Sequence, residues 1–344
     1  MKDIKNLIKE ELEREIINIG CKKFNAVQIL NWIYKKRVSS FEIMSNLSKD
    51  LRTKLNDFFY IGRLKILQKQ VSKNQDTVKF LFVCEDKEKI ESVLIKQGNR
   101  YTICISTQVG CPFKCKICAT GKIGFIRNLT TSEILSQILE TEKEESIITD
   151  NIVFMGMGEP LANYENFKKA VRFITDKEAI GMSYSRLTVS TCGLVPSIER
   201  LINDNLKINL SISLHSVVDR VRNLLTPINR KYNIKELFKV CKKYNKHFKL
   251  PVTFEYVLIK DVNDSEKDCK ELIELIREFK ISCKVNLIPL NIVRIIEFKP
   301  SSKEVVRSWQ ERLETSNIVT TIRIEKGADI HSACGQLAGD RNFG

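Results

Sequence analysis

The stretch GCPFKCKICATG, residues 110–121, carries three cysteines within eight residues: Cys111, Cys115 and Cys118. The spacing C-x3-C-x2-C puts three thiols on one loop, close enough to bind one metal centre together. Soft metals are usually held by four such ligands. A structural zinc site would take its fourth ligand from a second cysteine pair or a nearby histidine, and the surrounding sequence offers neither. The spacing therefore favours a [4Fe–4S] cluster with three protein ligands, whose fourth iron stays open for another molecule.

Short β runs and helical segments alternate from about residue 90 onward. Each apolar run is followed by a segment with helical spacing of its apolar residues, as in TTSEILSQIL (130–139). Six such β–α units and a last strand predict an α/β fold with a parallel sheet, either open or curved into a full or partial (β/α)6 barrel. The seven runs are YTICIST (101–107), NIVFM (151–155), RLTVST (186–191), KINLSISL (207–214), VTFEYVLI (252–259), CKVNLIPL (283–290) and VTTIRIE (319–325).

Polar and small residues gather where these predicted strands end. Chemistry in βα folds concentrates at the carboxyl ends of parallel strands, because those ends meet at one edge of the sheet. We therefore expect one site that is built from many loops. The residues at the strand ends are the cysteine loop, GMGEP (156–160), Ser190, Thr191, Ser213, His215, Asn286 and Asn291.

The first part of the chain has a different pattern. Residues 1–85 show helical periodicity, as in FNAVQILNWIYKKR (24–37), and end in a strand-like VKFLFVC (78–84). Ser48 before KDLRTKL suits a helix N-cap. We predict a small, mostly helical N-terminal accessory domain over residues 1–85 and a βα core over residues 86–344.

Charge and composition limit the functional class. The net charge is +15, from 57 Lys and Arg against 42 Asp and Glu, and residues 1–100 hold 21 basic and 13 acidic side chains. Both an ordinary lysine-rich surface and a nucleic-acid partner fit this excess. No apolar run of about 18 residues and no secretory h-region occur, so we expect a cytoplasmic protein without a membrane span. Eleven cysteines in such a chain do not indicate a disulfide scaffold.

The cysteine loop after the first strand of a βα series resembles the signature of radical S-adenosylmethionine (SAM) enzymes. The resemblance implies a [4Fe–4S] cluster on Cys111, Cys115 and Cys118, with SAM at the open iron. It also implies SAM contacts elsewhere. For His215, a capped histidine at a strand end is the competing interpretation. The implied SAM-binding residues are Gly158, Glu159, Ser190, Ser213, Leu214, His215 and Asn291.

Longer strings resemble one subfamily, the RlmN/Cfr RNA adenine methyltransferases. They run along nearly the whole chain: QVGCPFKCKICATG, GMGEPLANY, STCGLVP, SLHS, PINRKY, VNLIP and ACGQLAGD. The resemblance implies two further catalytic cysteines, Cys104 on the first strand and Cys334 near the C-terminus. Without the resemblance, each of these two cysteines would be interpreted as a structural thiol.

The implied reaction consumes two SAM molecules per turnover. Cys334 first takes a methyl group and forms S-methylcysteine. A radical then links that methyl carbon to the adenine ring, and Cys104 resolves the protein–RNA adduct through a transient disulfide with Cys334. Glu91 is the implied proton acceptor, with an exposed strand carboxylate as its alternative.

The resemblance also implies the partners. These are 23S ribosomal RNA and the anticodon loop of some transfer RNAs, with an electron donor such as flavodoxin or ferredoxin; a monomer suffices. The basic residues Lys22, Lys23, Lys35, Lys36 and Arg37 are our hypothesis for an RNA-binding surface.

Three alternatives remain at this point. Cfr-type enzymes methylate C8 of adenine in 23S rRNA and confer antibiotic resistance, and they use the same cysteines. A non-catalytic RNA-binding iron–sulfur assembly factor would need the cluster but neither Cys104 nor Cys334. A radical SAM enzyme for a small molecule would not need the basic N-terminal part. Pro160 and TFEYVLI resemble the C2 enzymes.

Overall fold

The computed structural model describes residues 1–291, 298–323, 326–333 and 335–338. Its centre is a ten-stranded sheet with the order β14-β13-β12-β11-β10-β9-β6-β5-β4-β3. The seven strands from β14 to β6 are parallel, and β5, β4 and β3 continue the sheet antiparallel. Their bounds are β3 Lys65–Val71, β4 Thr77–Val83, β5 Lys89–Gln97, β6 Arg100–Cys104, β9 Asn151–Phe154, β10 Leu187–Thr191, β11 Asn209–Ser213, β12 Val252–Leu258, β13 Cys283–Pro289 and β14 Val319–Ile322.

Helices follow the parallel strands, as the alternation in the sequence predicted. Several begin at a capping box, in which an N-cap side chain and the residue three positions later satisfy each other's backbone N–H groups; Thr130 with Glu133 is one example. The predicted α/β class and the six β–α units are confirmed. The helices are α5 Thr131–Glu145, α6 Tyr164–Thr175, α7 Val195–Asn203, α8 Asp219–Leu225, α9 Ile234–Phe248, α10 Glu266–Phe279 and α11 Lys303–Thr315.

One face of the sheet packs against helices through large aromatic residues. Phe154 of β9 meets Phe167 of α6 edge-on at 4.8 Å between ring centroids, and Phe254 of β12 stacks on Phe238 of α9 at 5.1 Å. Such pairs add specific geometry to the burial of apolar area. Successive strand residues point to opposite faces, so the residues between these aromatics form a second face, which we call the inner face.

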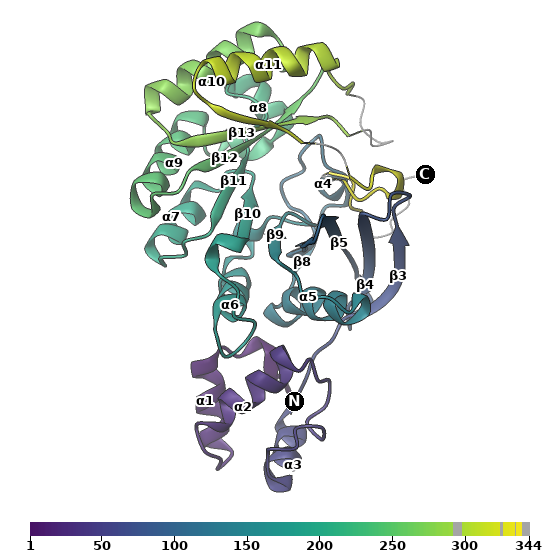
Figure 1. Cartoon of the computed structure of the whole chain (residues 1–344). Helices are drawn as coiled ribbons and strands as arrows, with labels where there is room; N and C mark the ends of the chain where they lie inside the picture. Colours follow the sequence, from purple (N-terminus) through teal and green to yellow (C-terminus); the bar gives the residue numbers. More distant parts are fainter. Residues whose placement is uncertain (292–297, 324–325, 334, 339–344) are drawn as a thin grey trace.

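The N-terminal helices form a separate group at one end of the molecule (Figure 1). They are α1 Lys9–Asn18, α2 Asn25–Leu30, which continues as a π-helical turn over Asn31–Lys35, and α3 Lys49–Phe58. The strands β1 Lys2–Asp3 and β2 Phe59–Tyr60 pair beside them. The predicted N-cap is confirmed, because the Leu51 N–H donates to Ser48 Oγ at 3.2 Å. No helix within the described ranges is long and apolar enough to cross a membrane.

Strands β3 and β4 connect this group to the core. Both lie within residues 1–85, the predicted N-terminal domain, of which only VKFLFVC was predicted as a strand, yet they hydrogen-bond into the ten-stranded sheet. The boundary proposed between residues 85 and 86 therefore lies in the turn of the β4–β5 hairpin. Side-chain pairs also fasten the N-terminal helices to α5 and α6: Arg37 with Glu142 at 2.7 Å, Arg63 with Glu140 at 2.8 Å and Lys169 with Glu11 at 2.8 Å.

Lys5 lies fully buried in this junction and gives it a testable pH dependence. Its Nζ donates to Ser136 Oγ of α5, and burial lowers its pKa from 10.5 to about 8. Below pH 8 Lys5 is protonated in both the folded and the unfolded state, so burial of the charged ammonium lowers the free energy of unfolding by its full amount. Between pH 8 and 10.5 only the unfolded state keeps the proton, so the contribution of Lys5 to stability rises with pH.

We therefore expect Lys5→Met to raise the free energy of unfolding at pH 7, by up to about 3 kcal/mol. Ser136 Oγ also donates to Ser132 O, so the substitution leaves that hydroxyl paired. Urea unfolding of both proteins at pH 7, 8, 9 and 10 measures the difference, in which the titration of all other groups cancels. A difference that does not shrink between pH 8 and 10 would contradict the assignment to Lys5.

Candidate active site

The three clustered cysteines lie in the loop of a short hairpin next to β6. Strand β7 Gln108–Gly110 pairs antiparallel with β8 Phe125–Asn128, and α4 Ala119–Ile123 fills the end of the loop between them. Gly110 has φ +73°, and any side chain there would overlap the carbonyl oxygen of Gly124. The glycine thus allows the two strands to close directly beneath Cys111.

The donor set of this loop fits a soft metal centre. Burial raises the pKa of Cys111 to about 12 and that of Cys115 further, and the nearby Cys118 acts on both in the same direction. Neighbouring thiolates in a poorly solvated pocket need positive charge, which bound iron supplies. No group of three His, Cys, Asp or Glu side chains in the described part of the chain is arranged to hold a metal ion. Ligation by Cys111, Cys115 and Cys118 therefore stays a proposal.

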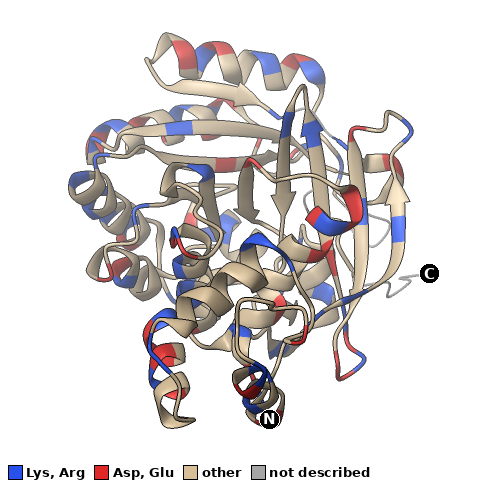
Figure 2. Ribbon diagram, turned by 60° about the horizontal axis from the view of Figure 1, so that its bottom comes forward, with Lys and Arg blue, Asp and Glu red and all other residues tan. Residues whose placement is uncertain are grey.

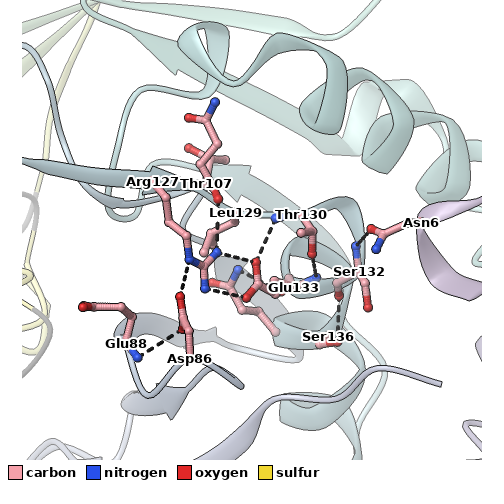
Figure 3. Close-up of polar contacts among 12 residues, drawn as sticks. Asn6, Asp86, Glu88, Thr107, Arg127, Leu129, Thr130, Ser132, Glu133 and Ser136 are labelled. Carbon is pink, nitrogen blue, oxygen red and sulfur yellow. Dashed lines mark hydrogen bonds and ion pairs between the residues drawn. The ribbon is translucent and has the colours of Figure 1, made fainter. Parts of the chain in front are cut away.

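Arg127 of β8 anchors the cysteine hairpin to its surroundings (Figure 3). Its guanidinium binds both oxygens of Glu133 at the start of α5, at 2.8 Å each, and Asp86 Oδ2 at 2.6 Å. Glu133 also accepts the Thr130 N–H in the capping box. A bidentate arginine pair of this kind fixes orientation as well as distance. The hairpin is therefore fastened to α5 and to the β4–β5 turn.

We expect Arg127→Met to loosen the hairpin, at a cost of about 1–3 kcal/mol for the lost charged hydrogen bonds. Hydrogen exchange measured by mass spectrometry should show faster exchange in residues 108–128 and unchanged exchange in α9. Arg186→Met is the matched control, since Arg186 makes a single, longer ion pair with Asp150 at 3.5 Å. Equal protection of the hairpin in both variants would show that Arg127 does not anchor it.

The glycine-rich turn after β9 packs directly against the cysteine hairpin. Gly158 has φ +94°, and a Cβ there would overlap the side chain of Gln108. Gln108 in turn accepts the Glu159 N–H through Oε1 at 2.8 Å and donates to Asn128 Oδ1 at 2.8 Å. One glutamine side chain thus connects the turn to both strands of the hairpin. Gln108 stands three residues before Cys111, and its role in connecting the turn to the hairpin was not predicted from the sequence.

The carboxylate of Glu159 is buried and accepts hydrogen bonds from backbone N–H groups. It accepts the Cys192 N–H at 2.8 Å and the Leu161 N–H at 3.1 Å. Burial raises its pKa above the usual 4.5. Glu159 therefore links the end of β9 to the end of β10, in addition to the SAM contact predicted for it.

The strand register places several predicted site residues on the inner face. Cys104 pairs with Val93, two residues after Glu91, so Cys104 and Glu91 point to the same side of the sheet. Ser190 and Ser213 face that side too, with their hydroxyl oxygens 3.5 Å apart. The structure thus brings residues from four different strands to one face.

Glu91 is buried, with 4% of its surface exposed, so the alternative of an exposed strand carboxylate is wrong. Its Oε1 lies 3.0 Å from Lys79 Nζ of β4, and its Oε2 accepts the Ala338 N–H at 2.7 Å. The carboxylate therefore lies between β4 and the C-terminal loop. Both of its oxygens are thus engaged by donors, a lysine ammonium and a backbone N–H.

The described part of the C-terminal loop covers the same edge of the sheet. Gly335 O accepts the Ala119 N–H at 2.7 Å, directly after Cys118, and Leu337 O accepts from Thr120 Oγ1 at 2.7 Å. On the other side, Lys73 N donates to Asp329 at 2.8 Å. Residues 326–333 and 335–338 therefore contact the cysteine loop on one side and strands β3 to β5 with their turns on the other. Cys334 itself lies outside the described residues.

His215 is held by backbone at the end of β11. The Val257 N–H donates to its Nδ1 at 3.1 Å, and its φ of +58° is left-handed. Burial, with a contribution from the charge of Arg222, lowers its pKa to about 3. The ring is therefore neutral, and because Nδ1 accepts, the proton is assigned to Nε2. Asn291, two residues after β13, is partly buried.

A polar row crosses the inner face and was not predicted from the sequence. Glu255 of β12 accepts from Ser211 Oγ and from Asn286 Nδ2, both at 2.7 Å, and Thr321 Oγ1 donates to Asn286 Oδ1 at 2.9 Å. Ser213 stands in register with Glu255. The signal was a carboxylate inside the apolar run VTFEYVLI. The other members of the row come from β11, β13 and β14, so the run alone could not reveal it.

Comparison with known proteins identifies the class of enzyme that this arrangement belongs to. Residues 105–288 match the model of the Radical SAM superfamily, so the chain is a radical SAM enzyme. Residues 2–61 match the ribosomal RNA large subunit methyltransferase N-terminal domain. A solved radical SAM methyltransferase from Sphaerobacter thermophilus superposes with a TM-score of 0.93 at 38% identity and covers 99% of this chain and 100% of its own.

Two curated relatives define the family more closely. A probable dual-specificity RNA methyltransferase RlmN from Thermotoga petrophila is 46% identical over 98% of this chain and 97% of its own length. The protein of the same description from Caldanaerobacter subterraneus subsp. tengcongensis is 42% identical over 98% of both. The chain belongs to the RlmN family of radical SAM RNA methyltransferases, which confirms the resemblance seen in the sequence. Membership implies a [4Fe–4S] cluster, SAM and an RNA substrate.

Proposed function

We propose that this enzyme methylates C2 of adenosine in 23S ribosomal RNA, at the peptidyl transferase centre, and in the anticodon loop of some transfer RNAs. The main support is the packing of the C-terminal loop, which holds the neighbours of Cys334 against Glu91 and the cysteine loop. Cys104 stands on the inner face of the sheet, in register with Val93, and a role of Cys334 at the same face is part of the proposal. A non-catalytic assembly factor would need neither cysteine.

Carbon 2 of adenine is electron-poor and has no acidic proton, so a polar methyl transfer to it fails. The [4Fe–4S] cluster, with SAM bound, supplies the radical chemistry that this carbon requires. In our proposal Cys111, Cys115 and Cys118 hold the cluster. The residues that bind SAM are Gly158, Glu159, Ser190, Ser213, Leu214, His215 and Asn291, and two SAM molecules are used per turnover.

The protein's own residues divide the remaining work. Cys334 carries the methyl group as S-methylcysteine and then bonds covalently to the RNA base. Glu91 accepts the proton that leaves the ring, and Lys79 Nζ lies 3.0 Å from its Oε1. Cys104 attacks the sulfur of Cys334, so that a disulfide forms as the sulfur–carbon bond to the product breaks. The target base has to leave its stack to reach the inner face.

The basic N-terminal surface needs a narrower definition than the sequence suggested. Arg37 is partly buried and pairs with Glu142, and Lys23 is exposed but pairs with Glu13 at 3.2 Å. Lys22, Lys35 and Lys36 are exposed and form no ion pair within the described part of the chain. Lys and Arg are otherwise interspersed with Asp and Glu over the helices (Figure 2). We propose Lys22, Lys35 and Lys36 as the RNA contacts. Reversing all three charges should weaken RNA binding and reduce its salt dependence.

The test is mass spectrometry of nucleosides from ribosomal and transfer RNA after reaction with the reconstituted enzyme, a chemical reductant and SAM. We expect 2-methyladenosine in both RNAs and none with Cys334→Ala, which should still bind RNA. Formation of 8-methyladenosine would instead assign the enzyme to the Cfr-type reaction. Absence of any methylated adenosine, with an intact cluster and cleaved SAM, would overturn the substrate assignment.

A further inference from the structure

Arg222 of α8 is a charged side chain with no exposed surface. It forms no ion pair within the part of the chain that the structure describes. Its guanidinium donates instead to three carbonyl oxygens, those of Cys192 at 2.7 Å, Leu214 at 3.1 Å and Ser213 at 3.2 Å. A fourth bond reaches Asn229 Oδ1 at 2.9 Å. Burying a charge without a counter-ion costs several kcal/mol, so this cation needs an explanation beyond ordinary packing.

The three carbonyls belong to the ends of two neighbouring strands. Cys192 follows β10, and Ser213 and Leu214 end β11. The N–H of Cys192 is in turn held by Glu159. One guanidinium therefore connects the segments that carry most of the proposed SAM contacts. Gly193 allows this approach, because a Cβ at that position would lie 3.2 Å from Arg222 Nη2 and its φ is +108°.

The same side chain lies behind the cysteine loop. The Lys116 N–H donates to Leu225 O at 3.0 Å, which joins that loop to the end of α8 one turn after Arg222. The carboxylate of Asp219 is kept from the guanidinium by Asn229, whose Nδ2 donates to it at 2.7 Å. The charge of Asp219 still acts on the guanidinium from beyond Asn229, but the two form no ion pair within the described residues.

We propose that Arg222 is a positioning residue whose buried charge offsets the negative charge of the thiolate-bound cluster and stabilises its reduced form. This rests on the proposed ligation by Cys111, Cys115 and Cys118. Three thiolates make the site anionic, and reduction by an external one-electron donor adds a further negative charge. A fixed cation in a poorly solvated interior stabilises the reduced form more than the oxidised form, so it raises the reduction potential.

The experiment measures the midpoint potential of the reconstituted cluster without SAM, by a titration followed by electron paramagnetic resonance. Arg222→Gln removes the charge and keeps part of the hydrogen bonding. Asn229→Asp is made together with Asp219→Asn, so that two carboxylates do not meet where Asn229 now donates to Asp219. It leaves Arg222 in place and sets a carboxylate on it, so it tests the charge without removing the side chain. Arg222→Lys keeps the charge and loses the planar guanidinium that donates to several carbonyl oxygens at once. Arg220→Gln, on the exposed side of the same helix, is the matched control.

We expect the equilibrium constant for reduction to fall at least tenfold in Arg222→Gln and in Asn229→Asp, which is about 59 mV for one electron. Arg222→Lys and Arg220→Gln should stay within threefold of the parent. Unchanged potentials in Arg222→Gln and Asn229→Asp would overturn the proposal and leave Arg222 a structural tether. If Arg222→Gln does not fold, Asn229→Asp decides alone. A parent protein that binds no iron would instead refute the proposed cluster site.

Discussion

Replacing Cys104 by alanine is expected to leave the enzyme covalently attached to its RNA. The variant keeps Cys334, so it should still accept a methyl group and form the bond to the base, but no thiol remains to release it. Cys104 is 8% exposed and lies between Val93 and Val153 of the neighbouring strands, where water has little access to replace it. Product should fall below one equivalent per enzyme. Denaturing gel electrophoresis with a labelled RNA fragment detects the attached species.

Cys84→Ala is the matched control for this prediction. Cys84 is a thiol of similar burial, at 5% exposed, and stands just past the end of β4. Its loss removes the same atom from the core and should leave repeated turnover intact. Adding Cys334→Ala to Cys104→Ala should abolish the attachment, because the nucleophile is then gone. Repeated turnover by Cys104→Ala would rule out the proposed resolving role.

The βα core could be predicted because its signals are local. Each parallel strand is a short apolar run, and α5, α9, α10 and α11 each begin at a side-chain N-cap. The antiparallel extension was harder to assign, since β3, KILQKQV, is mostly exposed and its apolar residues do not show which sheet it joins. Register with β4 decides that, and register is a tertiary property.

The candidate site likewise contains residues that the sequence reveals and residues that it does not. Cysteines, glycines and strand-end residues stand out in the sequence because their chemistry or conformation is unusual there. Arg222 and Glu255 do not, because each gains its meaning from partners far along the chain. Arg222 reads as one of several charges in VDRVRNLL, yet the fold buries it completely and directs it at Cys192, thirty residues earlier. Electrostatic partners of this kind are visible only once the strands are assembled.

Replacing Gly158 by alanine is expected to disrupt the turn that we propose binds SAM. A φ of +94° costs alanine about 1–3 kcal/mol. The new Cβ would also overlap the Gln108 side chain and lie 2.9 Å from the Gln108 backbone nitrogen. Gln108 cannot move aside without losing its bonds to Glu159 and Asn128. Overpacking of this kind adds about 1–3 kcal/mol.

The combined strain should displace Glu159 and weaken its hold on Cys192, so we expect the Kd for SAM to rise at least tenfold and methylation to fall with it. Equilibrium dialysis with labelled SAM measures the first effect, and thermal unfolding the accompanying loss of stability. Gly98→Ala is the control, because Gly98 also has positive φ, +58°, but nothing lies within 4 Å of its added Cβ. Gly98→Ala introduces only the backbone strain of a positive φ, in a turn between β5 and β6. It should therefore bind SAM as the parent does. Parent-like SAM affinity in Gly158→Ala would show that this turn does not form the SAM site, whatever its effect on stability.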